Sequence, residues 1–267
     1  MVDVQVAIWT TFLGIIVAAL FIYMYWSHAC KNNKDKYSND IFLIIGPNGS
    51  GKTALFFNLS RGDKLQALST VSSIEPNFAN IRLPLEDDKK KRKEFQIIDY
   101  PGHLKYKPML NQLITEKLDS GHIKGFVYVI DSSPNYINED SIKFVTKELF
   151  SLLTLVERDP KGRDVLIAIN KQDLFGAMQI AKIRQMIESE MTKLIKYHLQ
   201  EKSVGEDEDH FEPNSFETTR ELWSSIVGTS SPKFSFDMLE SRVSFLGGSV
   251  LRKNTKEWIS WVDENFS

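Results

Sequence analysis

The stretch "IIGPNGSGKTAL", Ile44 to Leu55, decides the fold of this chain. An apolar run ends in a glycine-rich segment, and a helical pattern follows it. The pattern G-x-x-x-x-G-K-[ST] between a strand and a helix is typical of a phosphate-binding loop. Its glycines let successive backbone N–H groups turn toward phosphate oxygens, helped by the positive end of the helix. The sequence therefore predicts a nucleotide-phosphate site made by Gly46, Pro47, Asn48, Gly49, Ser50, Gly51, Lys52 and Thr53.

Two side chains of this loop and a later D-x-x-G motif predict how the phosphates and a metal ion are held. Lys52 is expected to reach the β and γ phosphates, and the Thr53 hydroxyl is expected to hold Mg²⁺. In "IIDYPGH", Asp99 ends an apolar run, where its carboxylate can hold Mg²⁺ through water. The backbone N–H of Gly102 is expected to meet the γ phosphate.

A third motif predicts which base is bound. "IAINKQD" places Asn170, Lys171 and Asp173 at the end of another apolar run. An aspartate can accept two hydrogen bonds from the N1–H and amino group of guanine, an edge that adenine does not offer. The phosphate loop alone does not separate ATP from GTP, but the three motifs in this order favour GTP as the nucleotide.

The rest of the chain alternates between short apolar runs and longer amphipathic ones, which predicts an α/β fold. A mainly parallel six-stranded sheet with one antiparallel edge strand is expected, flanked by helices. The predicted strands are "IFLIIG", "FANIRLPL", "EFQIIDY", "GFVYVID", "DVLIAIN" and "RVSFLGG". The predicted helices cover 53–59, 107–118, 140–156, 180–200 and 254–266.

The N-terminal segment is apolar enough to lie in a membrane. Val4 to Ala29 contains no Asp, Glu, Lys or Arg, and its apolar centre is long enough to cross a bilayer core of about 30 Å. A cleaved signal peptide is the alternative, but it needs a positive N-terminal region, and here Asp3 precedes the run. We therefore expect 1–30 to be a transmembrane anchor.

The charges that flank this segment predict its orientation. Lys31, Lys34 and Lys36 follow the apolar run, so the positive-inside tendency places the C-terminal side in the cytosol and the N-terminus in the lumen. Residues 31–40 are expected to be a tether, and 41–267 a cytosolic GTP-binding domain. Cys30, the single cysteine, is either unmodified or palmitoylated.

Composition limits the classes of partner. With 267 residues and 42% hydrophobic content, the chain can form one good-sized domain and an appendage. A net charge of -2 gives no reason to expect direct nucleic-acid binding. The stretch from Glu201 to Glu221 is acidic and poor in apolar residues, so it is predicted to be a loop, with His210 exposed in it rather than bound to a metal.

From Ile41 to the C-terminus the three motifs resemble the Ras-like GTPase superfamily. That resemblance implies that Asn170 contacts the purine ring, that Lys171 lies along the base and that Asp173 reads guanine. The family's S-A-K-like element has only a degraded counterpart, "FLGGSV", in which Ser249 best matches the serine. The contact to the guanine carbonyl is therefore assigned either to this segment or to backbone N–H groups.

More narrowly, the layout resembles the β subunit of the signal recognition particle receptor. The likeness rests on the membrane segment, the tether, "D-x-P-G-H", "GFVYVIDSS", "VSFLGGSV" and the long segment after "NKQD". It implies a single-pass endoplasmic reticulum protein that binds GTP and Mg²⁺ and docks the receptor α subunit for co-translational targeting. The ribosome or translocon are further candidate partners.

Two positions bear on hydrolysis. His103 follows Gly102 where many Ras-like hydrolases carry a water-orienting glutamine nearby; it is either a water-positioning residue or a spacer in a slow switch. The Mg²⁺-contacting residue of the first switch is assigned to Thr70, with Ser72 and Ser73 as rivals. Hydrolysis is expected to be slow or controlled by a partner.

Two other classes of protein compete with this interpretation. An Arf- or Sar-like trafficking GTPase uses an amphipathic N-terminal helix, whereas the segment here has no polar face. A P-loop nucleotide kinase would need an arginine-rich lid, and the "NKQD" motif and the anchor argue against it.

Overall fold

The structure is a computed structural model that describes residues 40–61, 72–83, 93–200, 213–228 and 232–266. The predicted anchor, the predicted tether up to residue 39 and Thr70 lie outside the described residues. Among the helices that the structure does describe, none is both long and apolar enough to cross a membrane. Residues from Asp40 onward form one compact unit.

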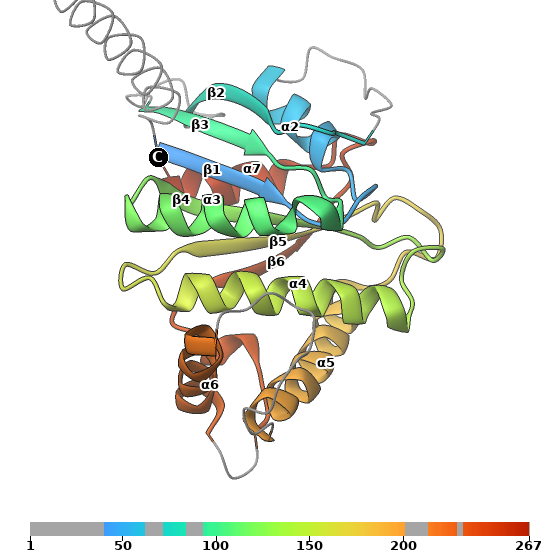
Figure 1. Cartoon of the computed structure of the whole chain (residues 1–267). Helices are drawn as coiled ribbons and strands as arrows, with labels where there is room; N and C mark the ends of the chain where they lie inside the picture. Colours follow the sequence, from blue (N-terminus) through green and yellow to red (C-terminus); the bar gives the residue numbers. More distant parts are fainter. Residues whose placement is uncertain (1–39, 62–71, 84–92, 201–212, 229–231, 267) are drawn as a thin grey trace, which may run out of the picture. The chain divides into compact units, whose positions relative to one another are not determined.

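A six-stranded sheet in the order β2-β3-β1-β4-β5-β6 forms the centre of the fold (Figure 1). Neighbouring strands are parallel except for the edge pair β2 and β3, which is antiparallel and sets Asn77 opposite Asp99. The strands are β1 (Asp40–Ile45), β2 (Asn77–Leu83), β3 (Lys93–Asp99), β4 (Ile123–Asp131), β5 (Asp164–Asn170) and β6 (Val243–Gly247). The fold class and the six predicted strands are therefore confirmed.

Helices cover both faces of the sheet, as the continuous apolar character of its central strands requires. Figure 1 shows α3 and α4 in front of the sheet and α7 behind it. On the α7 side, Trp258 and Trp261 join Leu55 and Phe56 of α2 in one buried cluster with Phe42. The helices are α2 (Lys52–Arg61), α3 (Lys107–Asp119), α4 (Glu139–Glu157), α5 (Ile180–Gln200), α6 (Pro213–Val227) and α7 (Lys256–Phe266), with short 3-10 turns η2 (Leu104–Tyr106) and η3 (Phe236–Met238).

Helix α6 corrects the prediction of a loop over 201–221. Its range, Pro213–Val227, overlaps the C-terminal part of that stretch, while 201–212 lie outside the described residues. The fully buried indole of Trp223 stacks on Phe150 with a centroid distance of 5.0 Å and donates to the Thr154 hydroxyl at 3.0 Å. This packing against α4 stabilises α6, since helices in proteins are stabilised mainly by tertiary packing of an apolar face.

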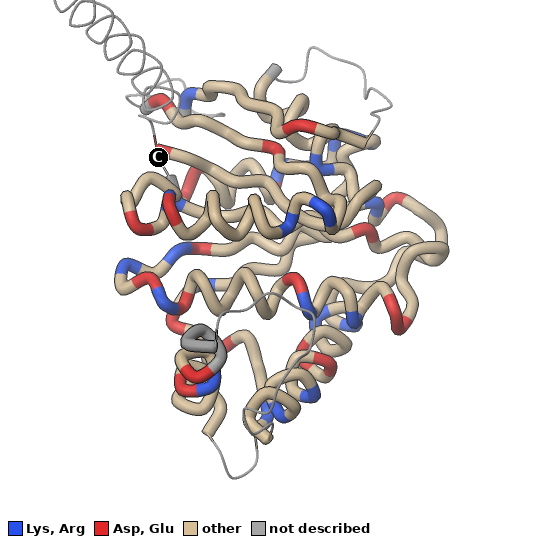
Figure 2. Tube along the Cα trace, in the orientation of Figure 1, with Lys and Arg blue, Asp and Glu red and all other residues tan. Residues whose placement is uncertain are grey.

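Charge is mixed along the helices that the structure describes. Figure 2 shows Lys and Arg interspersed with Asp and Glu along α5, and Arg184 pairs with Glu188 one turn later at 3.1 Å. Alternating signs of this kind are typical of a solvated helix face.

Five parallel strands end on the same edge of the sheet, and this positions the candidate site. In open α/β sheets, ligands bind outside the carboxyl ends of the strands. Here that edge brings together the residues that end or follow β1, β3, β4, β5 and β6, which are Gly46, Asp99, Asp131, Asn170 and Ser249.

Candidate functional site

The predicted phosphate loop joins β1 to α2 in a conformation that requires its glycines. Gly46, Gly49 and Gly51 have φ values of 135°, 76° and 98°, in the region that L side chains rarely adopt. The Lys52 ammonium donates to the carbonyl of Pro47 at 2.8 Å, across the curl of the loop. Burial lowers the pKa of Lys52, and the nearby Asp99 carboxylate opposes that shift.

Four oxygen- or amide-bearing side chains gather where the loop meets β2 and β3. The Thr53 hydroxyl donates to Asp99 Oδ2 at 2.8 Å, and Asn77 Nδ2 donates to the same oxygen at 2.9 Å. Ser73 Oγ lies 3.2 Å from both Thr53 Oγ1 and Asn77 Nδ2. The structure thus brings together the two predicted metal-binding residues, Thr53 and Asp99.

This cluster has the donor set that Mg²⁺ prefers. Asp99 Oδ1 is buried and has no hydrogen-bond partner among the described residues, and burial raises the pKa of its carboxyl. Hard divalent cations bind carboxylate, hydroxyl and water oxygens. A buried carboxylate with an unsatisfied oxygen is therefore a site that a cation would complete.

The structure describes two of the three candidates for the first switch, Ser72 and Ser73. Thr70 lies outside the described residues, whereas Ser73 contacts the Thr53 hydroxyl. Ser72 precedes it without a hydrogen bond to Thr53 or Asp99 in that cluster. Asn77, which the sequence motifs did not indicate, contacts Asp99 directly because the antiparallel register of β2 sets the two residues opposite each other.

Gly102 packs directly against the phosphate loop. A Cβ atom added there would lie 2.4 Å from the Gly46 carbonyl oxygen, 2.6 Å from Lys52 Nζ and 2.9 Å from the Asn48 nitrogen. The absence of a side chain therefore lets the D-x-x-G segment approach the loop that is expected to hold the terminal phosphate.

His103 is exposed and caps the turn that follows. Its Nδ1 accepts a hydrogen bond from the backbone N–H of Lys105 at 3.1 Å, at the start of η2. The ring lies edge-on to Tyr106 at a centroid distance of 6.3 Å. The structure thus gives His103 a capping role, and the choice between water positioning and a spacer stays a prediction.

A small cavity of about 30 Å³ adjoins this segment, with room for roughly one water molecule. Gly46, Gly102, His103, Tyr128 and Glu148 are among the residues that line it. The Tyr128 hydroxyl donates to Glu148 Oε2 at 2.8 Å. Burial raises the pKa of Glu148, although the Tyr128 hydrogen bond and Lys107 oppose the shift. Glu148 thus connects α4 with Lys107 at the start of α3, 4.0 Å from its carboxylate.

The Asn170 side chain links the N-K-x-D motif to two other loops. Its Nδ2 donates to the Ser50 carbonyl at 2.8 Å, and its Oδ1 accepts from the Val250 N–H at 3.1 Å. The predicted serine, Ser249, is buried, and its hydroxyl accepts from the backbone of Arg252 at 3.1 Å. Ser249 therefore shapes the turn after β6 in this structure.

The other two residues of this motif make ion pairs. The Lys171 ammonium lies 2.5 Å from Asp131 Oδ2, at the end of β4. Asp173 Oδ2 lies 3.8 Å from Arg252 Nε, so the turn after β6 also reaches the residue expected to read the base. Asp131 and Arg252 were not indicated by the sequence motifs.

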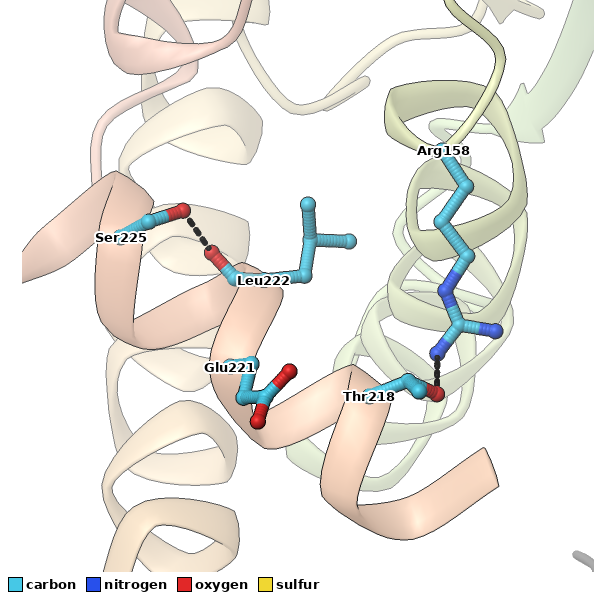
Figure 3. Close-up of a pocket in the computed structure, with 5 residues that line it drawn as sticks. All are labelled: Arg158, Thr218, Glu221, Leu222 and Ser225. Carbon is cyan, nitrogen blue, oxygen red and sulfur yellow. Dashed lines mark hydrogen bonds between the residues drawn. The ribbon is translucent and has the colours of Figure 1, made fainter. Parts of the chain in front are cut away.

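A second depression lies away from this edge, between α4 and α6 (Figure 3). Arg158 extends there from the end of α4 and donates to the hydroxyls of Thr218 and Thr219 at 2.9 and 2.7 Å. Ser225 donates to the Leu222 carbonyl at 2.7 Å. The Arg158 contacts join α6 to the end of α4, whereas the Ser225 contact lies within α6, and together they indicate a structural role for the residues that line the depression.

Comparison with known proteins identifies the family. The sequence model of the family described as "Signal recognition particle receptor beta subunit" matches residues 37–243. The chain is 28% identical over 233 residues to that subunit of Saccharomyces cerevisiae, covering 86% of each protein. It is 29% identical over 225 residues to that of Dictyostelium discoideum, covering 84% of this chain and 68% of the relative.

More distant relatives and solved structures agree with this fold. ADP-ribosylation factor 1 of Brassica rapa is 27% identical over 148 residues, 55% of this chain and 68% of the relative. A solved complex of SRb-GTP with SRX from Chaetomium thermophilum has a TM-score of 0.63 at 22% identity, covering 86% of this chain and 99% of the other. With the family match over most of its length, the chain belongs to the signal recognition particle receptor beta subunit family.

Proposed function

We propose that this chain binds GTP with Mg²⁺ and, in that state, docks the receptor α subunit at the endoplasmic reticulum membrane for co-translational protein targeting. The observation that carries the proposal is the double contact of Asn170, which joins the phosphate loop at Ser50 to the turn after β6 at Val250. The phosphate loop, the N-K-x-D motif and the turn after β6, which are far apart in the sequence, thus meet at one edge of the sheet.

Residues of this edge supply the groups that a nucleoside triphosphate needs. Lys52 and the backbone of the glycine-rich loop would bind the phosphates, and Thr53 and Asp99 would hold Mg²⁺, Asp99 through water. The bound cation would neutralise phosphate charge. Ser73, beside Thr53 at 3.2 Å, is the described residue best placed to contribute from the first switch.

The proposed partner surface lies on the segments that adjoin the γ-phosphate side. We assign it to 68–78 and 99–108, of which 68–71 lie outside the described residues. Ile74 and Leu104 are 74% and 57% exposed, and Met109, just beyond, is 63% exposed. A partner that covered these side chains would remove exposed apolar area from water. If these segments are ordered only when the γ phosphate is bound, docking of the partner would depend on the nucleotide.

Solved relatives support both the nucleotide and the partner. One Chaetomium thermophilum structure is described as an SRb-GTP/SRX complex, and two others as SRb-GDP-Mg and SRb-GDP. We propose the same ligands for this chain, with slow or partner-controlled hydrolysis. Single-turnover measurements on His103→Ala would decide whether His103 positions water or is a spacer. Loss of a water-positioning histidine would slow hydrolysis, whereas loss of a spacer would not.

The membrane topology is a further part of the proposal. The anchor at 1–30 would cross the membrane once, with the N-terminus in the lumen and the GTP-binding domain in the cytosol, supported by Lys31, Lys34 and Lys36. Protease added to intact microsomes should then remove nearly the whole chain and leave a small membrane fragment. Protection of 41–267 would contradict this orientation.

Docking is tested by titrating the full-length chain in detergent with the receptor α subunit, once with a non-hydrolysable GTP analogue and once with GDP. Coupling between two sites is typically 1–3 kcal/mol, so we expect affinity for the α subunit to be roughly 5- to 150-fold higher with the GTP analogue. By reciprocity, the α subunit should strengthen GTP binding relative to GDP binding by the same factor. Equal affinities would leave a constitutive anchor without a switch.

A further inference from the structure

The segment Asp131-Ser132-Ser133, at the end of β4, makes three contacts with the guanine motif and one internal contact. Asp131 Oδ2 accepts from the Lys171 ammonium at 2.5 Å. The Ser132 hydroxyl and backbone N–H both donate to the Asn170 carbonyl, at 2.6 and 3.1 Å. Ser133 N–H donates to Asp131 Oδ1 at 2.9 Å, so both oxygens of the carboxylate have a partner.

Asp131 and Ser132 are shielded from water, and Lys171 is partly shielded. Asp131 and Ser132 are 5% and 0% exposed, and the Lys171 side chain is 35% exposed. A charge-assisted hydrogen bond from a partly buried ammonium to a buried carboxylate is stronger and less screened than a surface ion pair. The Asp131–Lys171 contact therefore restricts where the lysine side chain can lie.

The backbone of Lys171 shows why such a restraint is needed. Its φ is 65°, one of two positive values among the non-glycine residues that the structure describes. A lysine adopts this left-handed conformation only where its surroundings compensate for the steric cost. Asp131 holds the side chain of Lys171, and Ser132 holds the carbonyl that immediately precedes it.

We propose that Asp131, assisted by Ser132, is a positioning residue for guanine recognition. It acts through Lys171, which would lie along the base, and through the backbone between Asn170 and Asp173. This inference rests on the proposed function, because it assigns a role within the proposed guanine site. Since the γ phosphate takes no part in these contacts, losing them should weaken GTP and GDP binding equally.

The test is a double-mutant cycle on the full-length chain in detergent, with GTP and GDP dissociation constants measured for each variant. Asp131→Asn should weaken the binding of both nucleotides by about tenfold, the size expected for losing one charge-assisted contact. Lys171→Met should have a similar effect, and the double variant should bind no more weakly than Lys171→Met alone. Asp164→Asn, which breaks an exposed pair with Arg242 at the other end of β5, is the matched control and should bind as the wild type does.

Three results would overturn the inference: unchanged affinities in Asp131→Asn, fully additive losses in the double variant, or a loss confined to GTP. If Asp131→Asn does not fold, as judged by its thermal unfolding, Ser132→Ala decides in its place. That variant should weaken GTP and GDP equally, and wild-type affinity would contradict the role. A wild-type chain that binds neither nucleotide would instead refute the proposed function itself.

Discussion

Asn170 Nδ2 donates a hydrogen bond of 2.8 Å to the carbonyl of Ser50, 120 residues earlier in the chain. The same side chain accepts from the Val250 N–H through Oδ1. Both contacts are buried. One amide group therefore sets the distance between the phosphate loop and the turn after β6. A shift of this amide would displace both segments.

Replacing Asn170 with alanine should destabilise the chain even without nucleotide. The change leaves the Ser50 carbonyl and the Val250 N–H without their partner, and each buried unsatisfied group costs about 1–3 kcal/mol. We expect a lower thermal unfolding midpoint and weaker GTP and GDP binding. Gln112→Ala is the control, because that amide makes only an exposed contact with Glu116. An unchanged midpoint in Asn170→Ala would show that the loops do not depend on this link.

Gly102→Ala should discriminate between nucleotides. The added Cβ would lie 2.4 Å from the Gly46 carbonyl oxygen, so backbone must shift, and such overpacking typically costs about 1–3 kcal/mol. Because Gly102 is expected to meet the γ phosphate, GTP affinity should fall more than GDP affinity. Equilibrium binding measurements with both nucleotides give the ratio of GTP affinity to GDP affinity. A ratio equal to that of the wild type would argue against a γ-phosphate contact at Gly102.

The buried Glu148 predicts a pH dependence of stability. Burial raises the pKa of its carboxyl above 4.5 in the folded chain. The folded state therefore binds this proton more tightly than the unfolded state, so this group stabilises the fold below pH 4.5 and that contribution is lost as pH rises through the raised pKa. Glu148→Gln cannot titrate there.

Denaturant unfolding at several pH values above 4.5 tests this expectation. As pH rises, the free energy of unfolding of Glu148→Gln should increase relative to that of the wild type. A constant difference for Glu148→Gln would mean that Lys107 and Tyr128 compensate fully for burial of the carboxylate.

Trp223→Ala should detach α6 from α4. The indole is fully buried and hydrogen-bonded to Thr154, and truncating a buried tryptophan typically costs about 3–5 kcal/mol. Trp223→Phe keeps an aromatic ring against Phe150 and removes the N–H donor, so it should lose less. Chemical denaturation of both variants measures the difference. Equal, small losses would indicate that α6 is held mainly by Arg158 and its contacts with Thr218 and Thr219.

Local pattern predicted the sheet because its strands are buried on both faces and read as unbroken apolar runs. It did not predict α6, because the acidic residues between 201 and 210 run directly into the start of the helix and conceal its apolar spacing. Phe216, Trp223 and Val227 recur there at helical spacing, a signal that a window crossing residue 221 would have found.

The side chains that complete the site were harder to predict. Sequence alone does not distinguish Ser73 from Thr70 and Ser72 as the Mg²⁺-contacting residue of the first switch. Only the folded path of the chain brings Ser73 next to Thr53. Asn77 reaches Asp99 through strand register, and Asp131 reaches Lys171 because β4 and β5 are neighbours. Such contacts join residues of different motifs, and spacing within one motif does not reveal them.

The central claim is that this edge of the sheet reads guanine, and exchanging Asp173 for asparagine tests it most directly. The carboxylate would accept from the N1–H and amino group of guanine, whereas an amide can donate to the C2 carbonyl of xanthine. We predict that Asp173→Asn loses about 2–4 kcal/mol of GTP binding free energy and prefers XTP over GTP, measured by equilibrium binding to the full-length chain in detergent. A variant that still prefers GTP over XTP would contradict the assignment of the guanine site.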